Sequence, residues 1–404
     1  MTAPSVHQGF AHSIIVWKPS MTWVVGPPNT NTWTPEGEDR GSITGEVESY
    51  KHVLRALGGY WSAEFTVNAE REYIEEWLDE RLGWHIEVHD EAGLTMFEGF
   101  VNEIDAVMGG FAVTRGPLLQ AANKVDLAYS TVDTTTTPPT VGIRAMTGIQ
   151  EDNAQQQKYG IIETILSAGG CTAAEALQVR RAWLADNARP RTTMRWSNPP
   201  AGRTAFTVRV LGYVHLMDHY TYSYTAATGT QNLEEKLGWV LDDDPNDLLN
   251  STTADITVTG ASITVRQYDD KQRTAWAIVK DLVARGDAEF DRYVFGVWAN
   301  RRAVYAQAPD TVDYHVRIAD VAQRVETPIG VEVYPWAVLP GRWALFTDFL
   351  VARTPPTADP RQDPRALFIE QATYTAPWSL DLQGGRADRT SQMLAQLGLS
   401  GVGG

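Results

Sequence analysis

The sequence of 404 residues has a single cysteine and no long apolar run, and its basic side chains are far fewer than its acidic ones. Because Cys171 has no second cysteine to pair with, an internal disulfide framework is excluded, and stability must come from packing or from association of copies. The small residues at 167–170 before it and a helical pattern after it favour a small buried side chain at Cys171 over a nucleophile.

The excess of acidic over basic residues argues against nucleic acid as a tightly bound partner. The chain has 34 Lys and Arg against 50 Asp and Glu, a formal net charge of -16. Tight binding to nucleic-acid backbones needs clustered basic side chains that replace counterions, so DNA is expected to pass without specific binding.

Neither a signal peptide nor a membrane helix is indicated. The longest apolar stretch, residues 336–350, is interrupted by proline, glycine and charged residues, whereas a membrane helix needs roughly 18 apolar residues. We therefore expect a soluble chain made in a cytoplasm, without membrane insertion.

Aromatic residues are abundant: 14 Trp and 15 Tyr in a chain that is 43% hydrophobic and 21% charged. Aromatics at this density suit β-sheets and wide interfaces. The length is sufficient for two to four domains.

The first half of the sequence is expected to be rich in strands. The run 60–67 alternates cleanly and predicts a strand, residues 70–83 have apolar side chains at helical spacing, and residues 84–107 predict a hairpin. The segment 26–41, rich in Pro, Asn, Thr and Gly, predicts a loop, and residues 130–140 predict an exposed loop or linker.

In the second half, helices are predicted over 159–170, 172–186, 233–242 and 274–286, and residues 206–226 predict a long strand bent at Gly212. The chain becomes β-rich again from residue 311.

The stretch WHIEVHDEAG, residues 84–93, places His85, Glu87 and His89 at alternate positions, hence on one face of a strand. Two imidazoles and a carboxylate are a plausible zinc or iron ligand set. The spacing differs from the helical H-E-x-x-H motif, and the pattern equally describes an antiparallel strand whose polar face lies in water. The second interpretation is favoured, and neither a metal nor a cofactor is predicted.

Asp242, Asp244 and Asn246 resemble the start of a calcium loop. The sixth position is Asp247, where such a loop needs glycine, and the twelfth is Thr253 rather than Glu. An acidic turn at a helix end is therefore favoured.

Other candidate groups are also better explained by structure than by chemistry. His215 and His219 could be ligands, but on a strand they would share a face with Met217 and be satisfied or partly exposed. No G-x-S-x-G elbow, P-loop or dinucleotide motif is present, so no catalytic residue is predicted and the chain is expected not to be an enzyme. Several tryptophans could stack on sugars, although strand alternation would bury most of them: Trp23, Trp33, Trp61, Trp336, Trp343 and Trp378.

The order of these elements resembles that of the baseplate-hub or tail-hub proteins of tailed bacteriophages and related contractile machines. The shared features are the strand, helix and hairpin of residues 60–104, the segment LGYVHLMDHY, and the helix-then-hairpin unit at 274–309. The hairpin spacing of Asp90, Gly93 and Gly99 and the W-x-x-x-R strand at 298–302 are similar to that group. The resemblance spans most of residues 10–385 but leaves 170–205 unplaced.

This resemblance implies a β-rich α+β fold with two β-barrel-like domains and with helical and mixed α/β insertions between them. The expected divisions are a first barrel-like domain at 1–130, a helical insertion with return strands at 131–230, a mixed α/β domain at 231–310, a second barrel-like domain at 311–385 and a flexible tail at 386–404.

It also implies a structural virion protein of the tail tip: a homotrimeric hub that joins the tail tube to a central fibre or spike and lines the channel for the tape-measure protein and DNA. The distal tail protein is an alternative position. An alternative class is a β-rich cell-wall hydrolase or carbohydrate-binding protein with His85, Glu87 and His89 as its metal set.

Overall fold

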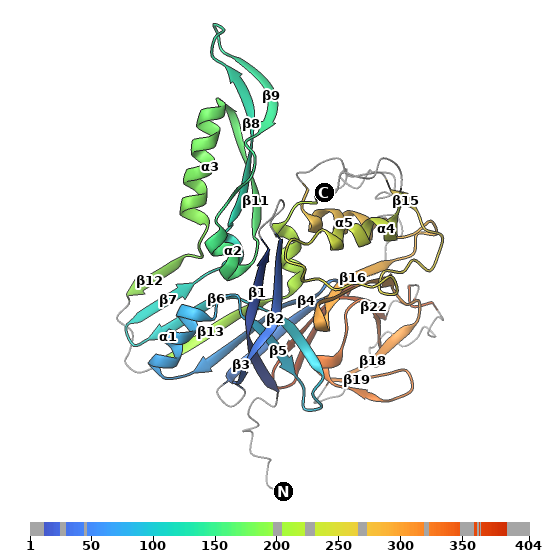
Figure 1. Ribbon diagram of the computed structural model, residues 1–404. Coiled ribbons are helices and arrows are strands. Elements are labelled where there is room, and N and C mark those ends of the chain that lie inside the picture. The colour runs from blue at the N-terminus through green and yellow to red at the C-terminus, as the bar shows by residue number, and fades with distance from the viewer. Residues whose placement is uncertain are drawn as a thin grey trace.

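The structure is a computed structural model that describes residues 12–24, 30–43, 47–196, 204–222, 231–265, 273–318, 323–347, 359–361, 363 and 365–385. A body built on one large mixed sheet carries an arm that projects from it (Figure 1). Strands outnumber helices, so the predicted β-rich α+β class is confirmed. Over these ranges the strand pairings branch but never close into a ring, so the body contains no closed barrel.

Seven antiparallel strands form the N-terminal part of the body. Their order across the sheet is β2, β1, β5, β6, β13, β4 and β3, and β13 arrives from far along the chain to fill the space between β6 and β4. The bounds are β1 Ser13–Val24, β2 Thr30–Ser42, β3 Val47–Arg55, β4 Leu57–Asn68, β5 His85–His89, β6 Thr95–Met108 and β13 Thr204–Leu211.

The predicted loop at 26–41 is wrong where the structure describes it, because β2 pairs along β1 from Thr30 to Ser42. The composition of β2 is polar and contains glycine, as is typical of a loop, but its backbone forms a strand because β1 supplies the hydrogen-bond partners. Around Pro19 the pairing of β1 with β2 shifts in register, between Lys18 and Ser20.

Helix α1, Arg71–Glu80, confirms the helical spacing seen in the sequence. It buries Ile74, Trp77 and Leu78 against the sheet, and the Trp77 ring lies 5.1 Å from that of Phe206 on β13. These side chains belong to the main core, which continues from α1 through the sheet to the C-terminal helices and strands.

C-terminal strands extend the same sheet. Strand β22 pairs antiparallel with β3, and β16 pairs parallel with β4. Helices α4 (Leu233–Asp242) and α5 (Ala275–Arg285) pack together beside β16, with the short strands β14 (Gln231–Asn232) and β15 (Thr264–Val265) at their side (Figure 1). The remaining bounds are β16 Tyr293–Trp298, β17 Arg302–Gln307, β18 Val312–Ile318, β19 Gln323–Glu326, β20 Glu332–Val333, β21 Trp343–Phe346, β22 Ala366–Thr375 and β23 Ser379–Gly385.

The arm is a small four-stranded sheet covered by one helix. Strand β8 pairs with β9, β10 and, in parallel, β11, and α3 packs on β8 (Figure 1). Its elements are β8 Lys124–Asp133, β9 Thr140–Met146, β10 Gln150–Glu151, α2 Asn153–Tyr159, β11 Glu163–Cys171 and α3 Ala173–Asn187. Strand β12 (Thr192–Trp196) then returns to the body and pairs with β7 (Phe111–Arg115).

The helix predicted over 159–170 is wrong, because these residues end α2 and form β11. Gly160, with φ 77°, stops α2, and the β-branched residues that follow pair with β8. Helix α3 matches its prediction and begins with a capping box between Thr172 and Glu175. The predicted loop at 130–140 is in part strand: β8 continues to Asp133 and an exposed turn leads into β9.

The long strand predicted over 206–226 ends at Leu211, where Gly212 packs on the Tyr60 backbone and a 3-10 helix, Tyr213–His219, follows. Segment 170–205, unplaced by the resemblance, supplies the end of β11, α3 and β12. The tail predicted at 386–404 lies outside the described residues.

Candidate functional site

The stretch around β5 is covered on both faces. Ile86 and Val88 are fully buried, as the alternation predicts, but His85 is fully buried as well, and Glu87 and His89 are only 18% and 20% exposed. The expectation of a polar face in water is therefore wrong for His85. The covering residues come from β2, from the 3-10 helix that begins at Tyr213 and from the turn between β16 and β17.

Glu87 is held between two imidazoles. One of its oxygens lies 3.1 Å from His85 Nε2 and the other 3.0 Å from His89 Nε2, and Tyr213 Oη lies 2.7 Å from His85 Nδ1. Burial opposes ionisation of Glu87, but the hydrogen bonds and charges of His85 and His89 outweigh it and lower the pKa of this carboxyl. The carboxylate form of Glu87 is therefore favoured.

Two further carboxylates and one guanidinium complete the group. Arg301 Nη1 contacts the Glu36 carboxylate and lies 3.5 Å from Glu98 Oε1, while the backbone N–H of Asn300 donates to Glu98 Oε2 at 2.6 Å. Asn300 and Arg301 have φ of 60° and 58° in the tight hairpin turn between β16 and β17. This turn brings the guanidinium to the buried carboxylates.

We call the set Glu36, His85, Glu87, His89, Glu98 and Arg301 the carboxylate–imidazole cluster. Ligand atoms of Glu36, His85 and Glu87 lie within 4.8 Å of one another, and within the described ranges no other group of three His, Cys, Asp or Glu does so.

The sequence prediction missed Glu36, Glu98, Arg301 and Tyr213. One signal was available: the hairpin turn at Asp90 fixes the register of β5 and β6, which places Glu98 directly opposite Glu87. Glu36, Arg301 and Tyr213 come from distant segments, and no local pattern points to them.

The acidic run after α4 works as a turn. Asp244 accepts hydrogen bonds from the backbone N–H groups of Asn246 and Leu248 at 3.0 and 2.9 Å, and Asn246 binds the backbone of Ile161 at the base of the arm. Two of the three candidate calcium ligands, Asp244 and Asn246, thus bind backbone groups, in agreement with the favoured interpretation.

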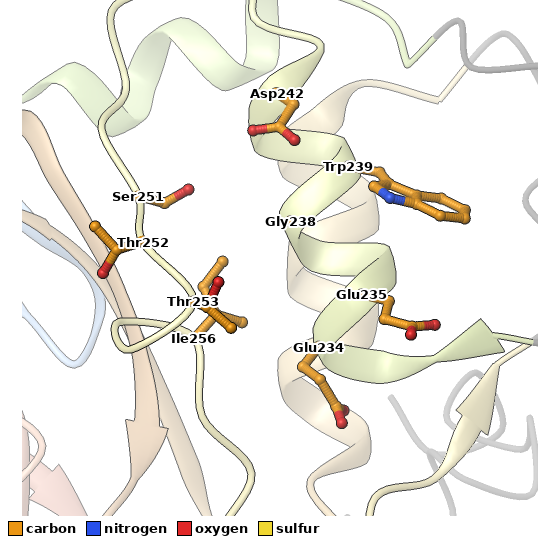
Figure 2. A pocket seen from close by; sticks show the side chains of 9 residues that line it. All are labelled: Glu234, Glu235, Gly238, Trp239, Asp242, Ser251, Thr252, Thr253 and Ile256. Carbon is orange, nitrogen blue, oxygen red and sulfur yellow. The ribbon is translucent and has the colours of Figure 1, made fainter.

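A pocket of about 380 Å³ lies between α4 and segment 251–256. In Figure 2 the Glu235 and Trp239 side chains point away from this segment, so the acidic side chains of the pocket do not converge on one point.

The other candidate residues from the sequence are not part of this cluster. His215 lies on a 3-10 helix rather than a strand and bonds the Trp61 carbonyl at 3.0 Å, and burial lowers the pKa of His219.

Cys171 is half-buried at the end of β11, so the expectation of a buried side chain holds only in part. Among the tryptophans, Trp33, Trp336 and Trp343 are buried, Trp61 is half-buried, Trp378 is exposed, and the Trp23 side chain lies outside the described residues.

Large apolar side chains are exposed on two edge strands. On β9, which pairs only with β8 among the described strands, Val141 and Ile143 are 68% and 82% exposed. On β12, whose one partner within the described part of the chain is β7, Trp196 is 80% exposed and lies opposite the exposed Phe111. We call these the arm edge and the base edge.

The arm and β12 together differ in charge from the rest of the chain. Residues 124–196 contain eight Lys and Arg and seven Asp and Glu, whereas the rest of the chain contains 26 and 43. The net charge of -16 therefore comes from residues outside 124–196. Among the helices of the described residues, none is long and apolar enough to cross a membrane.

No family model matches the sequence. A search of curated proteins likewise finds no match. The chain is similar in structure to the tail protein from Neisseria meningitidis MC58, with 6% identity, a TM-score of 0.40, and 91% of this chain and 92% of that one covered. It is also similar to the 43 kDa tail protein of prophage MuSo2 from Shewanella oneidensis, with 8% identity, a TM-score of 0.39 and 94% and 99% covered.

Proposed function

We propose that the chain is a structural component of a bacteriophage tail, and that it acts as a homotrimeric hub of the tail tip. In this role it joins the tail tube or distal tail protein to a central fibre or spike, and it lines a channel for the tape-measure protein and DNA. The proposal takes its class from the sequence resemblance. It includes no catalytic step.

The observation that carries the assembly role is the pair of apolar edge strands. An exposed edge strand with large apolar side chains is a template for association, and soluble monomers rarely leave such surfaces uncovered. Trp196, Met194 and Phe111 together offer an aromatic and thioether surface of the kind enriched at protein interfaces.

The charge distribution supports the same role. The strongly acidic remainder of each copy repels that of its neighbours at long range, whereas residues 124–196, which form the arm and β12, have balanced charges and can approach a neighbour without that cost. An acidic surface facing a channel would also repel DNA and let it pass without binding.

The first test is the mass and symmetry of the purified chain, by light scattering and by negative-stain microscopy. We expect a trimer with a threefold ring. A chain that stays monomeric at about 100 µM, or a sixfold ring, would overturn the trimeric hub, and the sixfold ring would instead support a distal tail protein.

The second test replaces Trp196 by Ser. Burying the exposed four fifths of a Trp side chain, about 200 Å², at about 25 cal/mol/Å² is worth up to about 5 kcal/mol per contact, so we expect the oligomer to dissociate at concentrations where the wild type is assembled. Leu94→Ser is the matched control, because Leu94 is 68% exposed in the β5–β6 turn, away from the arm. Equal association of both variants would exclude the base edge as an interface.

A further inference from the structure

The carboxylate–imidazole cluster has more carboxyl groups than permanent positive charges. Glu36, Glu87 and Glu98 face a single guanidinium, that of Arg301, so three carboxyl groups share one permanent positive charge. Buried charges are tolerated only when they are paired or coordinate a metal. A divalent cation would balance the group.

The pairing of β5 with β6 places two of these carboxyl groups next to each other. Glu87 and Glu98 are directly opposite in the antiparallel register, where like charges destabilise a sheet. Glu98 is 2% exposed, and its Oε1 has no hydrogen-bond partner among the described residues. Arg301 Nη1 lies 3.5 Å from this oxygen and also contacts Glu36, so Glu98 Oε1 lies within the cluster with an ion pair but without a hydrogen bond.

The orientation of His85 suits a ligand. Its Nδ1 is 2.7 Å from Tyr213 Oη, a contact that can fix the ring and leave Nε2 directed at the carboxylates. Metal-binding histidines almost always have such a partner on the second nitrogen. Because Glu36 and Glu87 are half-buried rather than sealed, an ion can enter from their side.

We propose that this cluster binds one divalent transition-metal ion of the zinc class, with Glu36, His85 and Glu87 as ligands. One nitrogen and two carboxylate oxygens match the preference of zinc, and the fourth position is left for water. The ion connects β2 to β5, which are both neighbours of β1, and its charge offsets the like-charge pair of Glu87 and Glu98. The proposed metal site is independent of the proposed tail function.

The test uses the full chain after dialysis against a chelator, titrated with zinc chloride by calorimetry. We expect one ion per chain and a higher melting temperature with zinc. Glu87→Gln and Glu36→Gln keep the side-chain shape but remove the ligand charge, so both should weaken binding at least about tenfold and abolish the thermal shift.

Glu64→Gln is the matched control, because Glu64 is a half-exposed carboxylate that pairs with Arg209 on the surface. It should bind zinc like the wild type. Absence of saturable binding to the wild type, or equal affinities for all three variants, would overturn the proposal. Assembly is measured by mass in separate samples, so a failure here is distinguishable from a failure of the tail function.

Discussion

Asn246 fastens the arm to the body, and its removal is expected to destabilise that junction. Its Oδ1 accepts from the backbone N–H of Ile161 at 2.7 Å, and its Nδ2 donates to the Ile161 carbonyl at 3.0 Å. The Asn246 carbonyl also accepts from the backbone N–H of Trp33 on β2 at 3.2 Å. One residue therefore connects the turn after α4, the base of the arm and the N-terminal sheet.

Asn246→Ala removes both side-chain hydrogen bonds at a position where Asn246 and Ile161 are 1% and 2% exposed. Water does not easily replace these bonds, so a buried N–H and a buried carbonyl lose their partners at about 1 to 3 kcal/mol each. We expect the free energy of unfolding to fall by about 2 to 5 kcal/mol, a large share of the 5 to 15 kcal/mol typical of a folded protein.

The assay is urea unfolding followed by circular dichroism, together with hydrogen exchange of the peptide around Ile161. Asn250→Ala is the control, because the exposed Asn250 side chain makes one hydrogen bond, to the Asn300 carbonyl, and its loss should cost under about 1 kcal/mol. If Asn246→Ala cost no more than the control and left exchange at residues 160–162 unchanged, the reasoning would be refuted.

Two further predictions concern His215 and a pair of glycines. Burial lowers the pKa of His215 to about 4, so its neutral form contributes stability that is present above about pH 6.5 and is lost as the pH falls towards 4, by up to about 1.4 kcal/mol per pH unit. His215→Gln should flatten this part of the acid-unfolding curve, and an unchanged curve would contradict the assignment. A Cβ at Gly212 would lie 1.7 Å from the Tyr60 carbonyl oxygen, so Gly212→Ala should lower stability by about 3 kcal/mol or more. Gly238→Ala, in α4 with open space around it, should raise stability by about 0.5 to 1 kcal/mol. If the melting temperatures of Gly212→Ala and Gly238→Ala shifted in the same direction, these two glycine predictions would be refuted.

Helices were predictable where their signals are local. Helix α1 has its apolar residues at helical spacing, α3 has a capping box, and α5 ends at a glycine. Each signal acts within about one helical turn, so the sequence around the helix is enough to find it.

Strands without a local signal were missed. The composition of β2 is that of a loop, and β11 has the apolar content of a helix, but both become strands because β1 and β8 supply their hydrogen bonds. Those partners lie elsewhere in the chain, and β propensity depends on such neighbours more than on the residue itself.

By itself, the sequence determined the class of fold, the acidic charge, the absence of an internal disulfide and the alternation that places His85, Glu87 and His89 on one face of a strand. Only the tertiary structure decided that this face is covered and that Glu98, Arg301 and Glu36 reach it. The physical reason is that alternation fixes which side chains share a face, whereas what covers that face depends on contacts between residues up to 265 positions apart.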